Sequence, residues 1–147
     1  MLFTLLSFPH PPQIGIDDPE YYVAITFKDA SAVTSHYTPD YVQFSMAPPL
    51  QTKGGDPRGL QAWFDTWEGP IGYAVGEAEI ATGGDLAVMH GLCRMSGTKV
   101  GGDKVDLWFR QTLGLRKAGG IWQIAHQHTS VPFYMDGSFN AAVDLAP

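Results

Sequence analysis

The chain has 147 residues, a length that fits one domain with one hydrophobic core. Its formal net charge is −6 and it has no run of lysine and arginine, which argues against a nucleic-acid partner because phosphates require clustered cations. Apolar residues make up 44% and charged residues 16%, so the composition is that of a folded protein and excludes an intrinsically disordered one.

Signals for compartment and membrane are few. The single cysteine, Cys93, excludes an intrachain disulfide and fits a reducing compartment. The start, MLFTLLSFPHPP, lacks the basic region and cleavage site of a signal peptide, and no stretch approaches the length of a membrane span. We therefore expect a cytoplasmic protein without membrane contact. Its apolar N-terminal arm, residues 1–16, should pack on the domain or on a partner subunit.

Two helix signals precede the strands. The first is Asp18 as N-cap with Pro19 at the first helical position, followed by a loose apolar stripe. Residues 37–46 then predict a turn and a short strand. The second signal is Asp56 with Pro57, followed by apolar residues at helical spacing through Trp67, and Gly69-Pro70 should end that helix.

After Pro70 the pattern changes to strands. Four strand-like segments, about 71–81, 85–96, 103–117 and 120–131, are separated by glycine-rich turns, and such short connections favour antiparallel hairpins. Helices followed by a long meander predict the α+β class, with the helices packed on one face of an antiparallel sheet.

A family resemblance extends over residues 17–133. The segments that carry it are YTPDYVQFS, LQAWFDTW, DLAVMHG and DLWFRQTLGLRKAGGIWQIAHQHTSVPF. In this order they resemble the SnoaL-like branch of the ketosteroid-isomerase and nuclear-transport-factor-like superfamily, which has a cystatin-like cone. The resemblance implies a curved antiparallel sheet with helices on its concave face around a pocket. It also implies a homodimer, since many relatives are dimers, and it separates the N-terminal arm from a C-terminal tail, residues 134–147.

The last strand carries two histidines. Strand alternation puts Trp122, Ile124, His126, His128 and Ser130 on one face, which we expect to be the concave one because it carries Trp122 and Ile124. His128 would then move a proton in a pocket, or lie in a closed polar network, which is the favoured interpretation for His126. A His-x-His pair can also bind a metal, but no further ligand motif accompanies it and no metal is expected.

Two more residues are catalytic candidates. Arg110 shares a face with Trp108; it would either point inward and bind an oxyanion or form a structural ion pair. Asp40 follows a proline early in the chain, where the resemblance places the proton-abstracting carboxylate of the steroid isomerases; the alternative is a turn cap.

Aromatic residues are the candidates for contacts with a ligand. Trp63 and Trp67 are expected on the second helix, either as core or as the cover of a pocket for a flat apolar molecule. The full set of candidate substrate-binding residues is Trp63, Trp67, Tyr22, Tyr41, Trp108, Trp122 and His126.

Two functional hypotheses follow. The first is a cofactor-independent enzyme, isomerase-like, cyclase-like or hydratase-like, acting on a small hydrophobic substrate that is polycyclic or bears a carbonyl. In it His128 or Asp40 moves a proton and Arg110 stabilises the oxyanion. The alternative is a non-catalytic ligand-binding or dimerisation module of the same fold.

Overall fold

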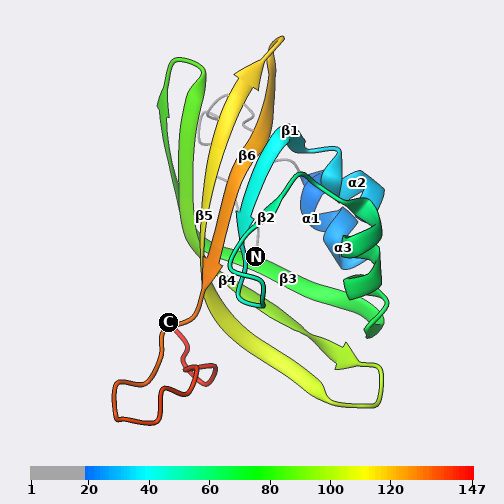
Figure 1. Cartoon of the computed structure of the whole chain (residues 1–147), viewed down its shortest axis with the longest axis vertical. Coiled ribbons are helices and arrows are strands. Elements are labelled where there is room, and N and C mark those ends of the chain that lie inside the picture. The colour runs from blue at the N-terminus through cyan, green and yellow to red at the C-terminus, as the bar shows by residue number, and fades with distance from the viewer. Residues whose placement is uncertain (1–18) are drawn as a thin grey trace, which may run out of the picture.

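The computed structural model describes residues 19–147 as three short helices and six strands. These are α1 (Pro19–Thr26), α2 (Ala30–Thr34), β1 (Tyr37–Phe44), β2 (Thr52–Lys53), α3 (Pro57–Phe64), β3 (Trp67–Gly83), β4 (Leu86–Lys99), β5 (Lys104–Ala118) and β6 (Ile121–Ser130). The helices lie together on one side of a strongly curved sheet (Figure 1). The predicted α+β class and curved sheet are confirmed. The expected packing of residues 1–16 and the cap at Asp18 lie outside the described residues.

The helices depart from prediction in two places. The N-terminal helix is interrupted at Lys28, whose φ is 61°, and Asp29 then caps α2 by accepting a hydrogen bond from the Ala32 amide at 3.0 Å. Helix α3 begins as predicted, with Asp56 as N-cap, but it ends at Phe64. Trp67 is the first residue of β3, so its predicted position on the helix is wrong.

The strand order is β2-β1-β6-β5-β4-β3. The four predicted strands form the antiparallel meander β3–β6, as expected. One pair differs from the antiparallel pattern of the sheet, because β1 lies parallel to β6. Parallel pairing requires a long crossover, and the chain supplies one because helix α3 and strands β3–β5 all separate β1 from β6.

A β-bulge divides β6 into two halves. Gln127 pairs with Leu113 and His126 with Gly114, but Ile124 pairs with Leu115, so Ala125 is an extra residue on β6. One extra residue reverses which side chains face the core.

The two halves of β6 therefore bury different sets of residues. Ile124 faces inward and is 1% exposed, whereas beyond the bulge Gln127 and Thr129 face inward and His128 is exposed. The predicted common face of Trp122, Ile124, His126, His128 and Ser130 is wrong from His126 onward.

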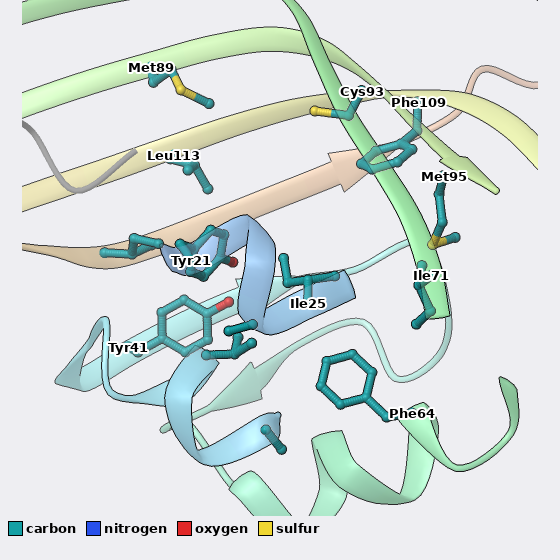
Figure 2. Packing of buried hydrophobic residues seen from close by; sticks show 14 of the residues in the cluster. Tyr21, Ile25, Tyr41, Phe64, Ile71, Met89, Cys93, Met95, Phe109 and Leu113 are labelled. Atoms are coloured by element: carbon teal, nitrogen blue, oxygen red, sulfur yellow. The ribbon is translucent and has the colours of Figure 1, made fainter. Parts of the chain in front are cut away.

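One continuous core joins the helices to the concave face of the sheet (Figure 2). From the helices and β1 come Tyr21, Ile25, Phe64 and Tyr41, and from the long strands come Ile71, Met89, Cys93, Met95, Phe109, Leu113, Leu115 and Ile124. Each described helix has at most eight residues and is too short to cross a membrane.

Candidate functional site

A cavity of about 870 Å³ opens between the concave face of the sheet and the helices. Residues of all three helices, of β1 and β2, and of the long strands line it. Its apolar lining comes mainly from Ile25, Val33, Leu60, Trp63, Phe64, Met95, Leu107, Phe109 and Val131. A cavity of this size with a mostly apolar lining suits a drug-sized molecule.

Three tyrosines form one wall of the cavity. The rings of Tyr37 and Tyr41 are stacked with centroids 3.9 Å apart, and the hydroxyl of Tyr21 lies 3.5 Å from that of Tyr37. The Tyr41 hydroxyl donates a hydrogen bond to Gln127 Oε1 at 2.9 Å. Burial raises the pKa of all three tyrosines above the ordinary value, so each stays protonated and neutral at physiological pH.

A second polar group lies on β3, β4 and β5. The Cys93 thiol donates to Gln111 Oε1 at 3.2 Å, and burial raises the pKa of Cys93 to about 11, so the thiol is protonated. Gln111 is 1% exposed, and its Nε2 has no hydrogen-bond partner among the described residues. Tyr73 lines the cavity beside this pair, and burial raises its pKa as well, although the neighbouring Gln111 partly opposes that rise.

The pairing register connects these groups across the sheet. Gln111 pairs with Thr129 of β6, which also lines the cavity. We define the concave polar band, in order from β1 to β3, as Tyr41, Gln127, Thr129, Gln111, Cys93 and Tyr73. Every member is uncharged. Among the residues whose side chains the structure describes, 21–76 and 78–147, the cavity lining contains no aspartate, glutamate, histidine, lysine or arginine other than Lys53 and Asp56. These two are exposed, and we call the part of the cavity that they line its mouth.

Two of the predicted ligand contacts line the cavity, Tyr41 and Trp63. Trp67 does not: it is 3% exposed and packs against Trp63 with ring centroids 5.7 Å apart. Tyr22 is half-buried behind the lining and stacks on Tyr73 at 5.6 Å. Trp122 packs against the core cluster near the start of β6, with Lys117 Nζ 5.8 Å from its ring centroid.

His128, Arg110 and Trp108 lie on the convex face of the sheet and not in the cavity. His128 is exposed, with its ring centroid 5.5 Å from that of Phe44. Arg110 is exposed and its Nε donates to Ser130 Oγ at 3.2 Å, while Trp108 is half-buried beside it on the same face. The predicted inward orientation of His128 is therefore wrong, and of the two alternatives for Arg110 the inward one does not hold. For His128 the bulge at Ala125 is the reason, and for β5 the inward face is the apolar one.

Asp40 and His126 also lie outside the cavity lining. Asp40 is exposed and accepts from Arg116 Nη1 at 3.2 Å, which makes a surface ion pair across to β5. His126 is half-buried, with its Nδ1 2.8 Å from the carbonyl oxygen of Val42. The structure therefore does not bring His128, Arg110 and Asp40 together at one site.

The cavity contains residues that were not predicted to be functional, namely Tyr21, Tyr73 and Gln127, and Gln111 lies beside them. Gln111 carried a detectable signal, because it stands between Phe109 and Leu113 in an alternating pattern whose other face is polar. Gln127 carried none, because its inward orientation depends on the bulge.

A curved sheet with helices on its concave face and a pocket between them defines an α+β cone. The model of the SnoaL-like domain matches residues 19–134, and this chain belongs to that family, as the resemblance predicted.

Solved structures agree with this assignment. An NTF2-like protein of unknown function from Pseudomonas putida has a TM-score of 0.80 and 28% identity, covering 92% of this chain and 94% of its own. A ketosteroid isomerase-like protein from Erwinia carotovora atroseptica has a TM-score of 0.68 and 25% identity, covering 84% and 97%. The association domain of C. elegans CaMKII, at 16% identity and a TM-score of 0.62, covers 80% and 92% and shows the fold alone. No curated protein matches the chain.

Proposed function

We propose that this chain binds a small, largely apolar molecule in its cavity and fixes the orientation of that molecule through the concave polar band. The observation that carries the proposal is a cavity of about 870 Å³ in which the interior polar groups of the described lining are neutral. An apolar lining with a few placed hydrogen-bonding groups is the usual composition of a small-molecule site.

The hydrogen bonds of the band indicate which atoms the ligand supplies. The Tyr41 hydroxyl donates a hydrogen bond to Gln127 Oε1, so the Nε2 of the same amide remains as a donor for the ligand. Gln111 Nε2 is a second donor, and it lacks a partner among the described residues. A buried donor without an acceptor costs about 1–3 kcal/mol, so a ligand oxygen that accepts these hydrogens is favoured. Carbonyl-bearing polycyclic molecules fit this requirement.

A cofactor-independent enzyme, isomerase-like, cyclase-like or hydratase-like, is the second candidate. The favouring observation is the group of neutral tyrosine hydroxyls in an apolar cavity, because a phenol there donates strongly to a carbonyl oxygen that gains negative charge. The similarity to a ketosteroid isomerase-like protein agrees with this chemistry. Binding remains the first proposal, because Asp56, the one carboxylate in the described lining, caps helix α3 at the mouth.

We also propose a cytoplasmic homodimer. Exposed apolar side chains near and in the C-terminal tail support the dimer, with Phe133 at 63%, Met135 at 85% and Phe139 at 66% exposure. Light scattering on the purified chain tests this: a molecular mass of twice 16.0 kDa is expected, and the mass of one chain at all concentrations contradicts the dimer.

The binding site is tested with Tyr41→Phe. Loss of the hydroxyl leaves Gln127 Oε1 without its donor, and we expect the free energy of unfolding to fall by about 1–3 kcal/mol. A thermal-shift screen over planar ketones such as 9-fluorenone should give hits on the wild type, because a ligand that binds the native state raises its stability. Affinity for such a hit should fall by up to about tenfold in Tyr41→Phe, because Gln127 loses the hydrogen bond that fixes its amide and directs Nε2 to the ligand.

The controls are Arg110→Ala and His128→Ala on the convex face. Both should bind the same hit with wild-type affinity, because neither side chain lines the cavity. Loss of binding in these two variants, together with unchanged binding in Tyr41→Phe, would move the site to the residues first predicted to be catalytic.

A further inference from the structure

Lys53 differs from the other cationic side chains of this protein. The sequence has nine lysines and arginines, and all lie within the described residues 19–147. Eight have a partner there: Lys28 with the Trp67 carbonyl, Arg58 with Asp56, Arg94 with Asp106, Lys99 with Thr66 and Trp67, Lys104 with Thr98, Arg110 with Ser130, Arg116 with Asp40, and Lys117 with Trp122. Lys53 has none among the residues that the structure describes.

Lys53 is also the one cation in the described lining of the cavity. It lies on β2, where it pairs with Val42 of β1, and it is exposed, which places it at the mouth. Its ammonium group is therefore available both to solvent and to a molecule that enters the cavity.

The one carboxylate at the same mouth has partners. Asp56 accepts a hydrogen bond from the Arg58 amide at 3.0 Å as the N-cap of α3, and its carboxylate lies 3.6 Å from Arg58 Nε. The helix N-terminus and the Arg58 guanidinium both offset its charge. Of the two charged residues at the mouth, Lys53 alone lacks an opposite charge.

We infer that the ligand of this cavity carries a carboxylate at one end and that this carboxylate pairs with Lys53 at the mouth. This inference rests on the proposed binding function. The rest of the ligand lies in the apolar interior, with its neutral oxygens at the concave polar band.

The physical argument is one of solvation. An ionised group cannot enter the neutral interior without a large desolvation cost, so the charged end stays where water and Lys53 both reach it. A single cation in a lining that also contains the Asp56 carboxylate suits a monoanion better than a doubly charged phosphate. The ligand class is thus an aromatic or alicyclic carboxylic acid.

The test uses three probes with one apolar body: 1-pyrenebutyric acid, 1-pyrenebutanol and 1-pyrenebutylamine. Fluorescence titration of the wild type should show the acid binding about fivefold more tightly than the alcohol, since a solvent-accessible ion pair contributes at most about that factor. Added salt should reduce the difference. In Lys53→Met the acid and the alcohol should bind equally, while Lys104→Met, which removes a cation outside the cavity lining, should retain the wild-type ratio.

The outcomes separate this inference from the proposed function. If the wild type binds the acid and the alcohol equally, the inference is overturned, but the proposed function stands. The same holds if Lys53→Met keeps the wild-type ratio of acid affinity to alcohol affinity. If the amine binds more tightly than the acid and the alcohol, Asp56 is the residue that pairs with a charged ligand at the mouth, and the inference about Lys53 is also overturned. If no probe binds the wild type and the planar-ketone screen gives no hit, the proposed function fails as well.

Discussion

Deletion of Ala125 is expected to preserve the fold and to change the free energy of unfolding by no more than about 2 kcal/mol. Ala125 is the extra residue that lets Ile124 and Gln127 both face inward. Without it, Ile124, His126 and Gln127 follow one another in regular alternation, so Ile124, Gln127 and Thr129 stay inward and only the bulge with its local bend is lost. Urea denaturation followed by tryptophan fluorescence measures the change.

The matched control for the deletion is Ala125→Ser, which keeps the residue count of β6. Because the bulge persists in this variant, its free energy of unfolding should lie within about 1 kcal/mol of the wild type. A deletion variant that fails to fold would show that the bulge is required for the fold. We expect the folded deletion variant to keep ligand binding, since Gln127 and Thr129 remain on the face that lines the cavity.

Alkaline pH is expected to unfold the chain steeply above about pH 10. The folded-state pKa values of Tyr21, Tyr37, Tyr41 and Tyr73 are raised by burial above the unfolded value near 10. The folded state therefore keeps protons that the unfolded state releases, so stability is fully present below the unfolded pKa and is lost as pH rises beyond it. Each such tyrosine contributes up to about 1.4 kcal/mol per pH unit, or on the order of 5 kcal/mol for four.

Thermal denaturation at several pH values measures this loss, with tyrosinate absorbance as the second readout. Absorbance should rise together with unfolding. Tyr73→Phe should reduce the slope of stability against pH by about one quarter, because one of the four buried phenols is removed. Ionisation of these four tyrosines near pH 10 while the chain remains folded would contradict the prediction.

Prediction from the sequence was most successful for the secondary structure after Pro70. The glycine-rich turns located β3–β6 to within a few residues, and Asp56 with Pro57 located the start of α3. Both signals are local, because a glycine at positive φ and a capping carboxylate act within a few residues of their own position. Trp67 was predicted on the helix because its spacing of four residues from Trp63 fits helical periodicity. In the structure the helix has already ended, and Trp67 is the first residue of β3.

The candidate site was predicted less well, and the reason is specific. Alternation groups Asp106, Trp108 and Arg110 on one face and Leu107 with Phe109 on the other, but it does not say which face is inside. The structure buries the apolar face, which also carries Gln111. The tyrosine wall brings together Tyr21 of α1 with Tyr37 and Tyr41 of β1, and only the folded chain shows that contact.

The sequence by itself determined the elements and the α+β class, because turns, caps and periodicity are local features. The resemblance of its segments to the SnoaL-like family indicated the family, which the match over residues 19–134 confirms. The tertiary structure decided which side chains line the cavity. One extra residue at Ala125 turned His128 outward and Gln127 inward, and the pairing of β2 with β1 placed Lys53 at the mouth. These outcomes depend on strand pairing between distant segments, where a shift of one residue reverses every side chain that follows it.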